Sequence, residues 1–305
     1  MARLVAFIKL GRPKFLIGGL LFYGLGAALA AVAGATLDWQ AFAWGQAVIA
    51  ATQLMTNYSN DYFDLAADLA NVTPTHWSGG SRILPNGEIR PRVALITALV
   101  LLACALVSSI VLAISVHGRP LLLPISLLIM ALSWCYSAPP VRLLTRGLGE
   151  LATALVVTLL TPIFGFYLQR GAVGWLVLIA CLPLCGLQVA MLLTLELPDA
   201  AGDRALGKRT LVVRRDSEWG ARVCALIIAT SFLSLPVLVW CGLPWLIATL
   251  AAVSTPHAAW HCVRLVRGAF RDRKRNESLA FSGVALLVVA ALGELAGALI
   301  LGRAS

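Results

Sequence analysis

The sequence predicts an all-α, polytopic membrane protein with nine transmembrane helices around a central cavity. The 305-residue chain is 60% hydrophobic and only 12% charged, whereas soluble domains carry about 25% charged residues. Its apolar residues form long runs, each near the length that crosses a bilayer. The connectors between the runs are short and polar. No break in composition divides the chain, so we expect residues 1–305 to form a single domain.

The nine apolar runs define the expected membrane spans. Their ranges are 15–34, 40–60, 93–115, 120–137, 148–168, 174–196, 219–241, 243–263 and 279–301. Several are rich in Gly and Ala, which allows helices to pack closely in lipid. The preceding stretch "MARLVAFIKLGRPKFL" is basic and amphipathic. This pattern favours an interfacial segment over a cleavable signal peptide.

The distribution of basic residues predicts the orientation in the membrane. Of the 24 Lys and Arg residues, only Arg119, Arg170 and Arg303 follow odd-numbered spans, and the rest lie before the first span or after even-numbered ones. Because cytoplasmic segments carry the excess of Lys and Arg, we expect a cytoplasmic N-terminus in the cell inner (plasma) membrane. The net charge of +10 therefore reflects topology and attraction to the lipid bilayer, and does not indicate nucleic-acid binding.

The second span ends in an acidic stretch, "NDYFDLAAD", at residues 60–68. Asn60, Asp64 and Asp68 are four residues apart, so a helix places them on one face. Asp61 points about 100° away from that face. We therefore expect the first three residues to act together, and Asp61 to be dispensable for metal binding.

The sixth span ends in a second acidic stretch, "LELPDAAGDRALGKRT", on the same predicted side. Glu196, Asp199 and Asp203 again share one helix face. Carboxylates gathered near a bilayer repel one another unless a cation lies between them, and hard oxygen ligands suit Mg²⁺. The two stretches together predict a Mg²⁺ site, and its expected ligands are Asn60, Asp64, Asp68, Asp199 and Asp203.

Basic residues beside both stretches indicate that the site binds a diphosphate. Lys208 and Arg209 follow the second stretch, and Arg82 follows the first. Mg²⁺ is commonly shared with substrate phosphates, whose oxygens accept hydrogen bonds from Lys and Arg. A prenyl diphosphate has an apolar tail and a charged head, so it suits a site at the membrane boundary. Its allylic carbocation requires a dry cavity, which aromatic residues such as Tyr136 can line.

These residues resemble the two aspartate-rich motifs of the UbiA superfamily of intramembrane prenyltransferases. The first stretch matches its N-x-x-x-D-x-x-x-D pattern and the second its D-x-x-x-D pattern. The resemblance implies Mg²⁺-dependent transfer of a polyprenyl group, with Asp64, Asp199 and Lys208 as catalytic residues and an active site toward the cytoplasm. The expected substrate-binding residues are Asn60, Arg82, Arg142, Lys208, Arg209, Tyr136 and Lys14.

Four stretches resemble one branch of this superfamily, the 1,4-dihydroxy-2-naphthoate polyprenyltransferases of menaquinone biosynthesis. They are "GRPKFL", "NDYFD", "SGGSRILPNGEI" and "GLGE". The resemblance implies that the naphthoate is the aromatic acceptor. The stretch "LELP" departs from that branch, so 4-hydroxybenzoate or another acceptor stays open. A membrane terpene cyclase on the same scaffold is one rival. A secondary transporter is a rival from another class, although its ion sites would lie near the bilayer midplane.

Some residues receive no assignment from the sequence. Glu150 begins the fifth span, where it either caps the helix electrostatically or lines the cavity. Glu294 lies deep in the last span, and the roles of Glu196 and His76 are equally open. The prenyl chain length and the oligomeric state are not indicated.

Overall fold

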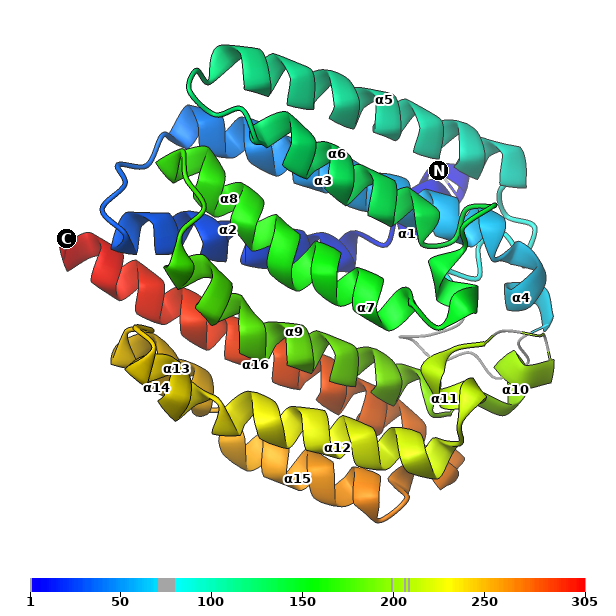
Figure 1. The fold of residues 1–305 in the computed structure, drawn as a ribbon. Coiled ribbons are helices and arrows are strands. Elements are labelled where there is room, and N and C mark those ends of the chain that lie inside the picture. The colour runs from blue at the N-terminus through cyan, green and yellow to red at the C-terminus, as the bar shows by residue number, and fades with distance from the viewer. Residues whose placement is uncertain (1, 71–79, 199, 206, 208, 305) are drawn as a thin grey trace.

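A computed structural model describes residues 2–70, 80–198, 200–205, 207 and 209–304. These residues form helices and connecting turns, and none of them lies in a β-strand. The long helices run side by side as one bundle (Figure 1). The all-helical prediction is therefore confirmed for the described residues.

The first half of the chain contains four long helices and several short ones. They are α1 (Ala2–Leu10), the short turn η1 (Pro13–Phe15), α2 (Leu16–Val32), α3 (Trp39–Phe63), α4 (Leu65–Ala70), α5 (Pro91–Ser115) and α6 (Leu122–Cys135).

The second half is more often interrupted. It contains η2 (Leu143–Arg146), α7 (Gly149–Thr153), the wider π-helical segment η3 (Ala154–Leu160), α8 (Thr161–Arg170), α9 (Trp175–Glu196), α10 (Ala200–Ala205), α11 (Leu211–Arg214), α12 (Ser217–Leu233), α13 (Leu235–Trp240), α14 (Trp245–Ala252), α15 (Thr255–Val266), η4 (Ala269–Arg271) and α16 (Arg273–Ala304).

Six stretches of the described chain are long and apolar enough to cross a membrane. They are Arg3–Val32, Pro91–Ser115, Gly149–Arg170, Trp175–Glu196, Ser217–Trp240 and Lys274–Arg303, and α6 is a shorter apolar helix. The expected span 40–60 coincides with α3, and the expected span 243–263 is divided between α14 and α15. The protein is thus a multi-pass membrane protein, while the count of nine crossings and the cytoplasmic N-terminus stay predictions.

The last helix of the chain, α16, packs against α2, the first long helix, and α2 also packs against α8. The segment Gly149–Arg170 is the most enclosed of the six, with 67% of its apolar window buried, against 22% for α5. The large exposed side chains of α5, such as Ile96, Val107 and Ile114, are placed to contact lipid. The inner position of Gly149–Arg170 matters because α7 begins beside the candidate site.

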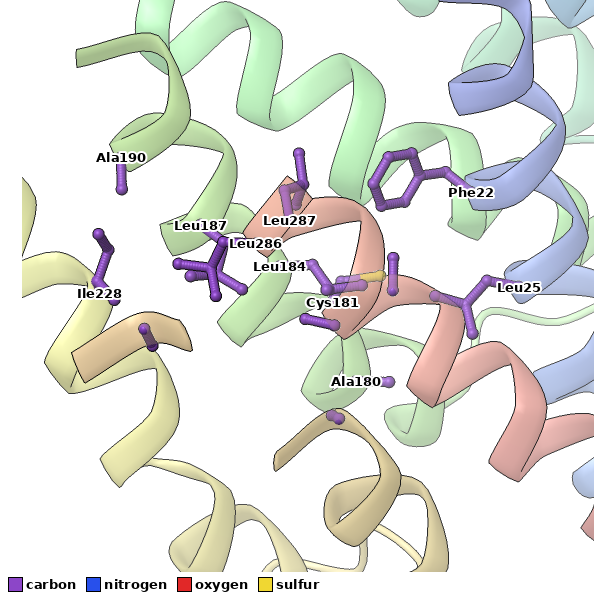
Figure 2. Packing of buried hydrophobic residues seen from close by; sticks show 14 of the residues in the cluster. Phe22, Leu25, Ala180, Cys181, Leu184, Leu187, Ala190, Ile228, Leu286 and Leu287 are labelled. Carbon is purple, nitrogen blue, oxygen red and sulfur yellow. The ribbon is translucent and has the colours of Figure 1, made fainter. Parts of the chain in front are cut away.

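A continuous apolar core joins α2, α9, α12 and α16. Figure 2 shows residues of this core from all four helices: Phe22 and Leu25 of α2, Leu184 and Leu187 of α9, Ile228 of α12, and Leu286 and Leu287 of α16. Leu25 and Leu184 are completely buried. This packing fixes α9, whose last turn carries Glu196 toward the second acidic stretch.

Glycines allow a close helix contact between α2 and α8. A Cβ atom at Gly26 would lie 2.0 Å from the carbonyl oxygen of Pro162, and one at Gly165 would lie 2.4 Å from that of Tyr23. The two backbones touch at both points, as expected where small residues line a membrane helix interface.

The two ends of the bundle differ in character. One end carries α4, α10 and α11 (Figure 1), and we call it the motif end. Exposed tryptophans mark the opposite end, at the starts of α3, α9 and α14 and the end of α13: Trp39, Trp44, Trp175, Trp240 and Trp245. Tryptophan is enriched where membrane helices meet the headgroup region. The bundle axis is therefore the axis that crosses the bilayer.

Candidate functional site

The first acidic stretch keeps its helical register across a helix break. Helix α3 ends at Phe63, and Asp64 caps it. The Asp64 N–H donates to the Asn60 carbonyl at 2.8 Å, and the Asp68 N–H donates to the Asp64 carbonyl at 2.9 Å. Because each step spans four residues, Asn60, Asp64 and Asp68 stay in helical sequence between α3 and α4.

The oxygens of these three side chains have distinct surroundings. Asn60 Oδ1 is buried and has no hydrogen-bond donor. Asp64 Oδ2 accepts a hydrogen bond from Ser137 Oγ at 3.0 Å. Asp68 is buried, with only 7% of its surface exposed. A buried amide oxygen without a donor is unusual, and together with the two carboxylates it supplies the hard oxygen ligands that fit Mg²⁺.

Asp61 has a separate set of partners. It is 1% exposed, forms an ion pair with Arg12, and accepts a hydrogen bond from the side chain of Ser81. It also accepts the Ser81 backbone N–H at 3.2 Å. Asp61 therefore joins α3 to the segment before α2 and to the loop that follows α4.

That loop is held close against the first acidic stretch. Gly80 has a positive φ of 77°, and a Cβ atom there would lie 2.1 Å from Asp68 Oδ2. Arg82 also has a positive φ of 64°, which is uncommon outside glycine. Its guanidinium donates to the Asp68 carbonyl. His76, whose role the sequence leaves open, lies outside the described residues.

The second acidic stretch lies at the same end of the bundle, where α10 and α11 are drawn beyond α9 (Figure 1). Asp199 and Lys208 lie outside the described residues. Asp203 belongs to α10 and is within electrostatic range of Glu196. Tyr136, at the end of α6, is within electrostatic range of both Glu196 and Asp64. The structure thus brings the two acidic segments toward one region.

No group of three His, Cys, Asp or Glu side chains in the described part of the chain is close enough to hold a metal ion. One expected ligand, Asp199, is not among those residues. Mg²⁺ usually keeps several waters and takes only one or two protein carboxylates together with substrate phosphates. Mg²⁺ therefore does not require a tight cluster of protein ligands, and widely spaced oxygens fit a metal that is shared with water and phosphate.

Basic residues border an open pocket beside the second stretch. The pocket has a volume of about 560 Å³ and is lined by Arg204, Gly207, Arg209, Val213 and Arg214. Arg204 donates to the Val213 carbonyl at 3.0 Å, and Arg214 Nε donates to the Arg209 carbonyl at 3.0 Å. These hydrogen bonds fix two guanidinium groups at the pocket wall, where a phosphate could bind.

Two expected substrate-binding residues lie on other segments. Arg142 is exposed and lies immediately before η2 as its N-cap residue, with a positive φ of 47°. Lys14 lies on η1, with Nζ 5.1 Å from the centre of the Phe15 ring and within electrostatic range of Glu277 on α16.

Sequence reasoning missed Ser137 and left Glu150 unassigned. Ser137 donates to Asp64, and Glu150 accepts the Leu211 N–H at 3.0 Å. The position of Ser137 on the same predicted side as the acidic stretches is the one signal that pointed to it. Nothing in the sequence indicated the partner of Glu150, because that partner is a backbone amide 61 residues away.

Comparisons with known proteins identify the family and the fold of the chain. Digeranylgeranylglyceryl phosphate synthase of Natronomonas pharaonis is 29% identical over 244 residues, which are 78% of each chain. A UbiA homolog from Archaeoglobus fulgidus bound to GPP and Mg²⁺ has the same fold, with a TM-score of 0.68, 17% identity and coverage of 98% of this chain and 99% of that one. The apo structure of a UbiA homolog from Aeropyrum pernix K1 gives a TM-score of 0.70 at 16% identity, over 92% and 96% of the two chains. The model of the UbiA prenyltransferase family matches residues 20–284, so the chain belongs to this family of prenyltransferases.

Proposed function

We propose that this protein transfers a prenyl group from a prenyl diphosphate to an acceptor, with Mg²⁺ as cofactor, at the cytoplasmic side of the plasma membrane. The observation that carries the proposal is the donorless, buried Asn60 Oδ1 in helical sequence with Asp64 and Asp68. The related protein from Archaeoglobus fulgidus, which is bound to GPP and Mg²⁺, supports it.

The proposed residue roles follow the charge of the substrate. Asn60, Asp64 and Asp68 would hold Mg²⁺ from one side, and Asp199 and Asp203 from the other. The metal supplies charge neutralisation for the departing diphosphate. The phosphate oxygens would be bound by five basic residues: Arg82, Arg142, Lys208, Arg209 and Lys14.

The remaining tasks concern the prenyl group. Tyr136 would present its aromatic face to the allylic cation as the bond from the prenyl carbon to oxygen breaks. The new bond forms between that carbon and the acceptor, which loses a proton or, for the naphthoate, its carboxyl group. The surrounding helices would exclude water, which would otherwise capture the cation.

For the acceptor we propose 1,4-dihydroxy-2-naphthoate, on the four stretches that resemble the menaquinone branch. A second candidate is a lipid that carries glyceryl phosphate. The relative from Natronomonas pharaonis, named as a digeranylgeranylglyceryl phosphate synthase, favours this candidate. Both acceptors are anionic, so charge alone does not separate them.

A product assay distinguishes these possibilities. The purified protein in lipid nanodiscs is incubated with Mg²⁺, labelled prenyl diphosphates and one acceptor at a time: the naphthoate, 4-hydroxybenzoate or a glyceryl phosphate lipid. We expect a prenylated product by mass spectrometry, release of pyrophosphate, and loss of both with EDTA. Pyrophosphate release with a cyclic hydrocarbon and no acceptor would identify a terpene cyclase. The absence of any Mg²⁺-dependent pyrophosphate release would refute the proposal.

Substitution of the acidic residues tests the metal assignment. Asp64→Ala or Asp199→Ala should abolish turnover in folded, membrane-inserted protein, because each removes a proposed Mg²⁺ ligand. Asp272→Ala, at an exposed position next to η4, is the control and should keep activity. Near-normal turnover in either test variant would contradict the metal site.

A further inference from the structure

Glu150 connects two distant segments at the motif end. It lies in the first turn of α7 and is only 1% exposed. Its Oε1 accepts the backbone N–H of Leu211, the first residue of α11, at 3.0 Å. The first N–H groups of a helix have no partner within the helix. Glu150 therefore caps α11. The partner of its Oε1 lies on another segment and does not belong to its own helix.

Glu196 brings a third segment to the same point. Its carboxyl group lies beside the side chains of Glu150 and Thr210. Glu150 Oε2 and Glu196 Oε2 are both buried without a hydrogen-bond partner. Through this pair, α7, the end of α9 and the start of α11 meet at one buried junction.

The loop before α7 packs closely against segment 209–214. The Arg209 N–H donates to the Thr145 carbonyl at 3.1 Å, and the Arg214 guanidinium donates to the Arg146 carbonyl. Gly147 has a φ of 66°, and a Cβ atom there would lie 2.6 Å from the Arg209 carbonyl oxygen. The segment with the basic pocket is thus seated against residues 145–150.

We propose that Glu150 is a positioning residue that holds segment 209–214 in the conformation that binds the diphosphate. This role rests on the proposed function. Arg209 and Arg214 are exposed, so without an anchor the segment would have to be ordered each time substrate binds. An anchored segment avoids that entropic cost and binds more tightly. Glu150 acts through the Leu211 amide, not by contact with the substrate.

Three variants at this position and one control test the proposal. Glu150→Ala removes the acceptor, and Glu150→Asp shortens it by one methylene while keeping the charge. Glu150→Gln keeps an oxygen for Leu211 and adds a donor for Glu196. Glu218→Ala removes an exposed carboxylate that pairs with Arg271 at the same end of the bundle.

We expect Glu150→Ala to raise KM for the prenyl diphosphate about tenfold, as for loss of one hydrogen bond to a charged group. Glu150→Asp should act in the same direction, kcat should change less than KM, and Glu150→Gln and Glu218→Ala should stay within about twofold of the unaltered protein. If Glu150→Ala does not fold, Glu150→Asp decides. A residue with only a general stabilising role would reduce the amount of folded protein and leave KM unchanged.

A second readout is independent of activity. Trypsin cleaves after Arg209 and Arg214, and hydrogen exchange reports the Leu211 amide. Both rates should rise in Glu150→Ala and Glu150→Asp, but not in Glu150→Gln or Glu218→Ala. If the unaltered protein has no prenyltransferase activity, the proposed function is refuted. Faster cleavage and exchange in the variants would then still support the positioning role. Unchanged cleavage, exchange and KM in Glu150→Asp would overturn the inference.

Discussion

Gly80 offers a direct way to test whether the position of Asp68 matters for the metal. Replacing Gly80 with alanine adds one methyl group beside the Asp68 carboxylate. The new Cβ would lie 2.1 Å from Oδ2, whereas ordinary van der Waals contact begins at 3.4 Å. The carboxylate must therefore move by more than 1 Å to restore ordinary contact.

The backbone contributes a second, separable cost. Gly80 has a φ of 77°, and a left-handed conformation costs an alanine about 1–2 kcal/mol. Gly87, seven residues later, has a φ of 72° and open space around its Cβ position. Gly87→Ala therefore carries the same backbone strain without the clash, and the difference between the variants isolates the displacement of Asp68.

The assay is initial rate against Mg²⁺ concentration at saturating prenyl diphosphate. A displacement of about 1 Å at a reacting site costs on the order of 100-fold in rate, so Gly80→Ala should lose activity on that scale and need more Mg²⁺ for half-saturation. Gly87→Ala should stay within about threefold of the unaltered protein, the range of a modest loss of folded molecules. Equal Mg²⁺ dependence in the two variants would refute the role of Asp68.

Two further predictions concern stability. Asp61→Ala should leave the Mg²⁺ requirement unchanged but lower the free energy of unfolding by about 3 kcal/mol, because it leaves Arg12 without its buried partner; an altered Mg²⁺ half-saturation at normal thermal stability would contradict this. Gly26→Ala should destabilise the bundle by about 1–3 kcal/mol, since its Cβ would press on a backbone carbonyl of α8. Gly24, on the same helix, has open space around its Cβ position, so Gly24→Ala is the control. Thermal denaturation compares the two variants, and equal melting temperatures for Gly26→Ala and Gly24→Ala would show that the α2–α8 contact is not tight.

The sequence was most informative where a regular helix relates residues to one another. The spacing of Asn60, Asp64 and Asp68 predicted a shared face, and the backbone hydrogen bonds keep that register although α3 ends at Phe63. Hydropathy likewise located the apolar helices to within a few residues. Both inferences depend on local geometry, which the chain carries in its own periodicity.

Contacts between segments were not predictable in this way. Ser137 reaches Asp64 from the loop after α6, 73 residues along the chain, and a serine in a polar loop has no pattern that identifies such a partner. The break of the expected span 243–263 into α14 and α15 was also not foreseen. Proline at position 256 restricts the residue before it and favours a new helix start there.

Two of the buried carboxylates outside the proposed metal site, Asp61 and Glu150, share a common arrangement. Asp61 accepts the N–H of Ser81, next to Arg82, and Glu150 accepts the N–H of Leu211, two residues after Arg209. Both acids are 1% exposed. In each case a basic residue expected to bind phosphate is carried by a loop whose backbone is tied to a buried acid. Since a backbone amide is available at almost every position, such an acid leaves no motif in the sequence. An acid outside the spacing of the proposed metal ligands can therefore still serve the proposed function, because Asp61 and Glu150 each hold a loop that carries a proposed phosphate-binding residue.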